Sequence, residues 1–159
     1  MKKNFPLILL ALLLGACQNK SILDETRTFA NSNWQRFEPE TFEANISNID
    51  DCYDLYVDAV IDTATYRDKT LPIIMSIFAP NGERRTIVGT IQVVNKNGTF
   101  MGTVDGGQVT CTQKIRDYLY FNNAGSHKFE ISQRTSHYDL RGVRSMTFRI
   151  VKSDLKLPD

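Results

Sequence analysis

The sequence feature that most constrains the fold is an alternation of apolar and polar side chains over residues 52–62. Tyr53, Leu55, Val57, Ala59 and Ile61 share one side of this segment, and Asp54, Asp58 and Asp62 share the other side with Tyr56 and Val60. Successive side chains of a β-strand point to opposite faces, so a period of two predicts a strand with one buried and one solvated face. No long stripe of helical period competes with it.

Further segments rich in Val, Ile, Thr, Tyr and Phe are bounded by turn residues, as strands are. They lie at residues 42–47, 71–79, 84–94, 100–104, 109–121, 128–133 and 145–151. Pro80-Asn81-Gly82 and Lys96-Asn97-Gly98 are typical of tight turns between strands. The segment 71–79 is apolar on both faces, which predicts a central strand covered on both sides. About eight strands with closely spaced turns predict an all-β fold, an antiparallel β-sandwich.

The N-terminus has the form of a bacterial lipoprotein signal. The chain opens with two lysines at positions 2 and 3, continues with an apolar run over residues 5–14, and reaches Gly15-Ala16-Cys17. Small residues before a cysteine allow a peptidase to cleave there, so residues 1–16 are expected to be removed and Cys17 to carry acyl chains such as palmitate. The 12 residues from 5 to 16 are too few for the roughly 20 that a spanning helix needs.

Domain organisation follows from this signal. Removing 16 residues from 159 leaves 143, the size of one ordinary domain. We expect the lipidated Cys17 and a flexible tether at 17–33, because residues 18–33 are polar and without period. The β-sandwich domain is expected at 34–152 and a loose C-terminal tail at 153–159.

Charge excludes one class of function and suggests an arrangement of strands. A net charge of +1 with 23 % charged residues gives no basis for nucleic-acid binding, which requires a strongly basic face. Residues 37–66 contain eight acids and no Lys or Arg, whereas bases outnumber acids after Cys111. This asymmetry predicts acidic and basic strands that pair across a solvated face. A dipolar docking surface is the alternative.

The three cysteines determine whether the protein could form a disulfide or bind a metal ion through thiolates. With Cys17 lipidated, Cys52 and Cys111 remain, and an exported protein can keep a disulfide between them. Alternation counts against the bridge, because Cys52 shares a strand face with Asp54 and Cys111 shares one with Val109. His127 and His137 have no ligand-like spacing, so we expect no metal site and no cofactor.

Candidate sites for chemistry or binding are few, and no catalytic motif is present. Asp54 and Asp58 would lie about 13 Å apart along a strand, too far for a glycosidase pair, so a small envelope hydrolase is the weakest hypothesis. Tyr56 beside these two carboxylates could stack a sugar, which makes a carbohydrate-binding surface lipoprotein another hypothesis. Exposed basic residues lie between the last two strands and are suited to an anionic polymer or an acidic partner; they are Arg134, His137, Arg141 and Arg144, with Tyr138 among them.

Short motifs along the chain together resemble a known family. These are the signal ending at Cys17, Trp34 before the first strand, Pro80-Asn81-Gly82 after an apolar strand, Gly98-Thr99-Phe100-Met101-Gly102, residues 125–129 with Ile131 and Gln133, Leu140-Arg141-Gly142-Val143, and Phe148-Arg149-Ile150. Their order resembles the gliding-motility lipoprotein family GldH of Bacteroidetes over nearly all of the mature chain. The segment 62–71 departs from the family pattern, because Tyr66 is followed by Arg67-Asp68-Lys69 and not by proline and an aromatic residue.

The resemblance implies a lipid-anchored, non-enzymatic accessory of the gliding-motility or an associated secretion machinery, built on a β-sandwich. It implies partners among envelope proteins and no family active site. Asp62-Thr63-Ala64 also resembles the O-glycosylation acceptor of exported Bacteroidetes proteins, which makes Thr63 a candidate modification site. Gln18-Asn19-Lys20 lacks the acidic residues expected for surface export in that phylum. An outer-membrane position facing the periplasm is therefore expected.

Overall fold

The computed structural model describes residues 21–156, which form eleven strands and one short 3-10 turn, η1 (Ala30–Ser32). The strands are β1 (Ser21–Thr28), β2 (Asn33–Gln35), β3 (Glu40–Ile46), β4 (Asp51–Asp62), β5 (Thr70–Phe78), β6 (Arg84–Gln92), β7 (Thr103–Asp105), β8 (Gln108–Tyr120), β9 (Gly125–Gln133), β10 (Asp139–Arg141) and β11 (Val143–Lys156). Over these residues no helix is long and apolar enough to cross a membrane.

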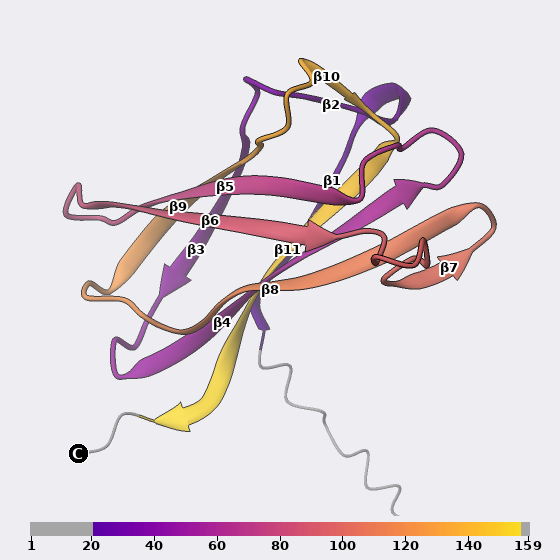
Figure 1. Cartoon of the computed structure of the whole chain (residues 1–159). Helices are drawn as coiled ribbons and strands as arrows, with labels where there is room; N and C mark the ends of the chain where they lie inside the picture. The colour runs from indigo at the N-terminus through magenta and orange to yellow at the C-terminus, as the bar shows by residue number, and fades with distance from the viewer. Residues whose placement is uncertain (1–20, 157–159) are drawn as a thin grey trace, which may run out of the picture.

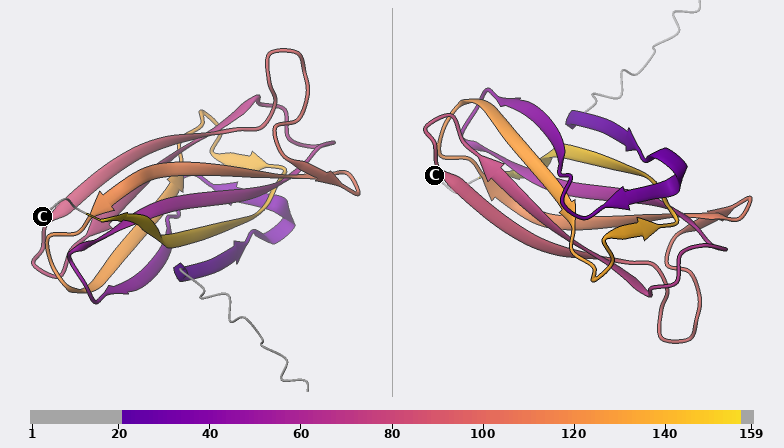
Figure 2. Two further views of the ribbon diagram at one scale, coloured as in Figure 1. Left: turned by 90° about the horizontal axis from the view of Figure 1, so that it is seen from below. Right: turned by 90° about the horizontal axis from the view of Figure 1, so that it is seen from above.

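The strands form two antiparallel sheets that pack face to face (Figures 1 and 2). One sheet has the order β1-β11-β4-β8-β7 and the other β3-β9-β5-β6, while β10 and β2 form a small separate ribbon. At the two long edges β1 lies near β3 and β6 lies near β8, so the layers approach each other on both sides. The predicted antiparallel β-sandwich is confirmed. The three strands beyond the predicted eight are β1, β2 and β10.

The inner faces of the two sheets form one core. On β4 the residues predicted to point inward, from Tyr53 to Ile61, are no more than 2 % exposed. The rings of Phe42 and Phe129 pack against Phe148 with centroids 5.3 and 5.2 Å away, which joins β3 and β9 of one sheet to β11 of the other. Aromatic contacts of this kind add to the free energy gained from apolar burial.

Strand β5 is central, between β9 and β6, but the prediction that it is covered on both faces is wrong. Its inner face from Leu71 to Ile77 is buried, whereas Ile74 and Phe78 on the outer face are half-buried. Two cations shield the outer ring: Lys128 Nζ lies 4.4 Å and the guanidinium carbon of Arg84 5.4 Å from the centre of Phe78. Long aliphatic stems of basic residues can cover apolar surface while their charges stay solvated.

The predicted flexible tether is wrong over residues 21–33. Strand β1 pairs with β11 from Ser21 opposite Val151 to Thr28 opposite Ser145. The sequence of β1 gives no strand pattern, because this edge strand is held by backbone hydrogen bonds and buries few side chains. Only Leu23 of β1 is buried. The predicted tail is also shorter, since β11 continues to Lys156. The signal at 1–16, the lipidated Cys17 and residues 157–159 lie outside the described residues.

The possible disulfide, against which strand alternation counted, is not formed in the structure, where Cys52 and Cys111 are both buried thiols. Cys52 lies opposite Tyr120, whereas Cys111 lies opposite Ala59. Ala59 is seven residues further along β4 than Cys52, about 23 Å at roughly 3.3 Å per residue. Disulfides need Cα atoms within about 7 Å, so the register of β4 with β8 keeps the two thiols apart.

Candidate functional site

The outer face of β4 brings Tyr56, Asp54 and Asp58 together as predicted, but their polar groups already have partners in the domain. Asp54 Oδ2 accepts a hydrogen bond from Lys114 Nζ at 2.8 Å. Asp58 accepts two from the Arg149 guanidinium, at 2.9 and 3.0 Å. The same cations lie 5.3 and 5.0 Å from the centre of the Tyr56 ring. Sugar hydroxyls would have to displace these contacts.

These pairs belong to a wider pattern across the five-stranded sheet. The acids of β4 each pair with a base on β8 or β11: Asp51 with Lys152, Asp54 with Lys114, Asp58 with Arg149 and Asp62 with Arg144. The hydrogen bond to Asp54 raises the pKa of Lys114, and the bond to Asp58 raises the pKa of Arg149. The predicted pairing of acidic and basic strands is confirmed.

Asp54 also holds a bulge in β8 that the sequence did not reveal. Opposite β4, Tyr53 pairs with Leu119, Leu55 with Arg116 and Tyr56 with Lys114, so β8 carries two extra residues over this stretch. Tyr118 adopts a positive φ of 47° and is 47 % exposed. Its backbone N–H donates to Asp54 Oδ1 at 3.0 Å. Asp54, which was predicted to bind a ligand, is therefore nearly buried and holds the backbone of the exposed Tyr118.

The predicted basic residues gather at another place, which we call the β2–β10 end: the β2–β10 ribbon with the loops at 63–69 and 134–138. A hollow of about 300 Å³ lies between the two loops and β10. We call it the β10 hollow; it is lined by Thr65, Tyr66, Arg67, Asp68, His137, Asp139, Leu140 and Arg141. Of the predicted residues it contains His137 and Arg141. Arg134 and Arg144 do not line it, and Arg144 pairs with Asp62 at 3.5 Å.

The 63–69 loop is held by close packing against β10. Gly142 has a φ of +91°, and a Cβ at this position would lie 2.6 Å from the backbone nitrogen of Tyr66. The Tyr66 hydroxyl donates to the carbonyl oxygen of Thr70 at 2.8 Å, and burial raises the pKa of that hydroxyl. The loop wall of the β10 hollow is therefore fixed by a buried side chain and a glycine.

Two side chains fix the turns on either side of the hollow. Asp62 Oδ1 accepts the N–H groups of Ala64 and Thr65, each at 3.0 Å. Desolvation opposes ionisation of this carboxyl, but these N–H donors outweigh it and lower the pKa of Asp62. On the other side, buried Gln133 accepts from the Thr135 N–H at 2.8 Å and donates to the His137 carbonyl oxygen at 2.9 Å.

Charge in the β10 hollow is partly unpaired. His137 Nε2 lies 3.3 Å from Asp68 Oδ2. Asp139 accepts a hydrogen bond from Asn33 Nδ2 at 3.2 Å, which ties β10 to β2. Within residues 21–156 the side chains of Arg67, Arg134 and Arg141 form no ion pair. Sequence reasoning missed Arg67, although the segment containing it was singled out as the departure from the family pattern.

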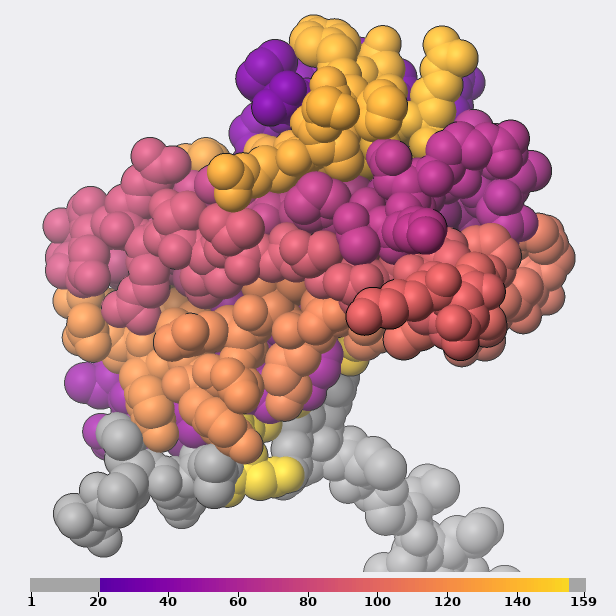
Figure 3. Space-filling model, viewed as in Figure 1, coloured from indigo at the N-terminus to yellow at the C-terminus, as the bar shows by residue number. Residues whose placement is uncertain are grey.

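Two exposed aromatic rings stand beside the β2–β10 ribbon. Phe37 is 72 % and Tyr138 59 % exposed, and their ring centroids lie 5.9 Å apart. The Arg36 guanidinium lies 5.5 Å from the Phe37 ring, and the Arg36 N–H donates to the Tyr138 carbonyl oxygen at 2.9 Å. In Figure 3 the segments of the β2–β10 end, coloured indigo and yellow, stand above the body of the sandwich. Phe37 was not predicted, because a single aromatic residue in a loop carries no pattern.

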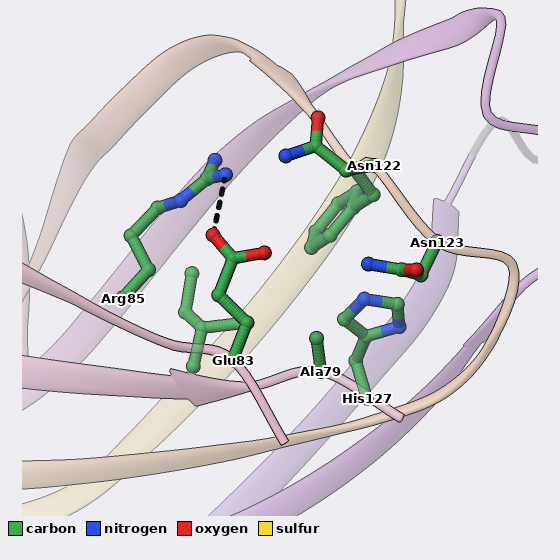
Figure 4. Close-up of a pocket in the computed structure, with 8 residues that line it drawn as sticks. Ala79, Glu83, Arg85, Asn122, Asn123 and His127 are labelled. Carbon is green, nitrogen blue, oxygen red and sulfur yellow. Dashed lines mark ion pairs between the residues drawn. The ribbon is translucent and has the colours of Figure 1, made fainter. Parts of the chain in front are cut away.

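A second pocket, shown in Figure 4, is too small for a ligand. It lies among the side chains of Ala79, Glu83, Asn123 and His127 and holds about 20 Å³, room for about one water molecule. His127 is 1 % exposed, and its Nδ1 lies 3.1 Å from the Gly125 carbonyl oxygen. This histidine is part of the packing of the β8–β9 connection.

The remaining candidates have local roles. The Thr63 hydroxyl donates to the carbonyl oxygen of Gly107 at 2.8 Å, while the neighbouring Ala64 and Thr65 are exposed. Modification of Thr63 stays a prediction, and it would break this hydrogen bond. Within residues 21–156 no three or more His, Cys, Asp or Glu side chains are grouped so that they could hold a metal ion.

Comparison with known proteins gives a consistent result over the chain. The model of the GldH lipoprotein family matches residues 21–150. A gliding motility lipoprotein, GldH of Flavobacterium johnsoniae, is 26 % identical over 165 residues, which cover 97 % of this chain and 99 % of that protein. The family match begins at the first residue of β1, where the sandwich starts.

Proposed function

This chain belongs to the GldH lipoprotein family, and we propose that it is a non-enzymatic component of the gliding-motility or an associated secretion machinery that acts by binding envelope proteins. The family is one of lipid-anchored gliding-motility lipoproteins and is not a known enzyme family. In this proposal Cys17 carries the lipid, and the domain faces the periplasm from the outer membrane.

The observation that carries the proposal is the composition of the β2–β10 end. Arginine and aromatic side chains are enriched at the centres of protein–protein interfaces, and few of them dominate the free energy of binding. Arg67 and Arg141 line a hollow beside the exposed Phe37–Tyr138 ring pair. Because these guanidinium groups have no ion-pair partner within residues 21–156, the partner we propose is an acidic protein surface.

The two rival hypotheses lose support from the geometry of β4. Glycan binding by Tyr56 and hydrolysis by a carboxylate pair both need Asp54 and Asp58 to be available. Both carboxylates instead hold bases on β8 and β11. A carboxylate that accepts a short hydrogen bond from a cation offers fewer lone pairs to a sugar hydroxyl.

The test is in-cell cross-linking of the full lipoprotein, followed by affinity isolation and mass spectrometry. Reversing two charges in Arg67→Glu/Arg141→Glu should lower recovery of gliding or secretion components about tenfold or more, equivalent to about 1.4 kcal/mol. The control Arg84→Glu/Lys96→Glu changes the charge equally, on β6 and the 95–98 turn, and should keep the partners.

Two results would count against the proposal. Recovery of no gliding or secretion component with the wild-type protein would remove the assembly role. Equal losses in both double variants would show that net charge, and not the β2–β10 end, governs the contact.

A further inference from the structure

Strand β1 begins very close in sequence to the proposed lipid. Cys17 and Ser21 are separated by 21 − 17 = 4 Cα–Cα steps, and Ser21 already pairs with Val151 of β11. Four steps of about 3.8 Å cannot span more than about 15 Å. With the acyl chains of Cys17 in the bilayer, the start of β1 is held within that distance of the membrane surface, so the domain lacks the long tether that would let it turn freely.

The surface around Ser21 can be followed across the sheet. Val151 pairs with Ser21 on one side and with Asp54 on the other, and Asp54 accepts the backbone N–H of Tyr118. Neighbouring strands lie about 4.8 Å apart, so the β8 bulge is about 15 Å from the start of β1, along one row of the sheet. Ile22, next to Ser21, is 40 % exposed, and Tyr118 is 47 % exposed.

The bulge presents Tyr118 at a conformational cost. A bulky residue at positive φ is sterically disfavoured, and such strain tends to occur at functional positions. The Asp54 carboxylate offsets it by accepting the Tyr118 N–H while pairing with Lys114. Tyr118 is 47 % exposed, so the conformation does not serve to bury its side chain.

The chemistry of this surface fits the headgroup region of a bilayer. Tyrosine is enriched at membrane–water interfaces, where its ring is apolar and its hydroxyl remains hydrated. Arg116 is exposed and forms no ion pair within residues 21–156, so its guanidinium is available to a lipid phosphate. The exposed Asp117 beside it offsets the net charge, which leaves the apolar side chains as the main contact.

We propose that Ile22, Arg116 and Tyr118 form a membrane-facing surface on which the domain rests against phospholipid headgroups beside its lipid anchor. The proposal rests on lipidation of Cys17, which is part of the proposed function. It also orients the molecule: β1 runs away from this surface for eight residues before the chain reaches η1 and the β2–β10 ribbon (Figure 1). The β2–β10 end is then turned away from the bilayer and open to partners.

The test uses tryptophan fluorescence of the full lipoprotein in vesicles of phosphatidylethanolamine and phosphatidylglycerol brominated near the headgroup. Trp34 is the sole tryptophan of the sequence; it is 1 % exposed and lies on β2, so it serves as an internal reference. In Tyr118→Trp the added emission should be quenched by the brominated lipid. In the matched control Tyr138→Trp, which also replaces an exposed tyrosine, and for Trp34 itself, emission should not change.

The outcomes separate this proposal from the proposed anchoring. Wild-type protein should float with the vesicles and Cys17→Ser should not; failure of that result overturns the lipidation and this proposal with it. Vesicle-bound protein in which Tyr138→Trp is quenched as much as Tyr118→Trp overturns the orientation and leaves the anchoring intact. Ile22→Trp provides a second probe of the same surface if Tyr118→Trp does not fold, and an unquenched Ile22→Trp overturns the proposal equally.

Discussion

The outer face of β4 and the β2–β10 end are both rich in charge, and both were predicted as binding surfaces, but they differ in what their charges contact. On β4 the acids Asp51, Asp54 and Asp58 hold bases of the neighbouring strands at 2.6 to 2.9 Å. At the β2–β10 end Arg67 and Arg141 line a hollow without ion-pair partners in residues 21–156. Sheet strands bring opposite charges into cross-strand register, whereas loops do not.

The two regions also manage backbone strain differently. In the β8 bulge the strained residue is a tyrosine, and a carboxylate from the next strand compensates for it. Next to β10, Gly142 adopts a positive φ; it has no side chain to strain and allows the Tyr66 backbone to approach closely. The β8 bulge leaves the Tyr118 ring exposed, whereas the close packing at Gly142 forms a wall of the β10 hollow. Substitutions at the supporting residues should therefore damage the two regions separately.

The largest effect is expected from Gly142→Ala. The new methyl group would meet the Tyr66 backbone at 2.6 to 2.9 Å, in addition to the strain of a positive φ, for a loss of about 3 kcal/mol or more in the free energy of unfolding. The control Gly106→Ala has positive φ and nothing within 4 Å of the new Cβ, so only about 1–2 kcal/mol is expected. Denaturant unfolding measures both. Equal losses would show that the 63–69 loop moves aside freely.

A smaller effect is expected from Asp54→Ala, at the other region. The substitution leaves the Tyr118 N–H and Lys114 without their acceptor, which should cost about 2 kcal/mol in the free energy of unfolding. Asp54→Asn keeps an oxygen for the N–H and should lose less. Asp58→Ala removes a surface ion pair to Arg149 but leaves no backbone N–H without its acceptor, so it should cost about 1 kcal/mol or less. If Asp58→Ala proved as costly as Asp54→Ala, the bulge would not depend on Asp54.

The fold was predictable wherever an apolar face had to be buried. The alternation in residues 52–62 identified β4 and its buried side correctly, because a central strand must place every second side chain in the core. The same logic failed for β1, whose sequence SILDETRT buries only Leu23. Backbone hydrogen bonds to β11 hold that strand, and they leave no trace in side-chain pattern.

The candidate site was predictable in part for a related reason. His137 and Arg141 were identified because they cluster in sequence, whereas Arg67 reaches the same hollow from a loop about 70 residues earlier, a distance that only the fold removes. The charge asymmetry predicted that acidic and basic strands pair, but it did not identify Lys114 and Arg149 as the partners of Asp54 and Asp58, because they are remote in the chain. Single-sequence patterns report what a residue is and which face it occupies, but not which distant side chain neutralises it.

Reductant is expected to have no effect on stability. The experiment tests whether a disulfide joins β4 to β8 in addition to the ion pairs on the outer face of β4. Burial raises the pKa of the Cys111 thiol, so little reactive thiolate forms near neutral pH. Dithiothreitol should leave the Tm unchanged, and Ellman's reagent should react with the buried thiols of Cys52 and Cys111 only after unfolding. A disulfide in their place would contribute about 2–4 kcal/mol and make the Tm fall on reduction. Such a fall in Tm would mean that β4 and β8 pair in another register. In that register Asp54 would not support the β8 bulge, and Tyr118 would not lie on the proposed membrane-facing surface.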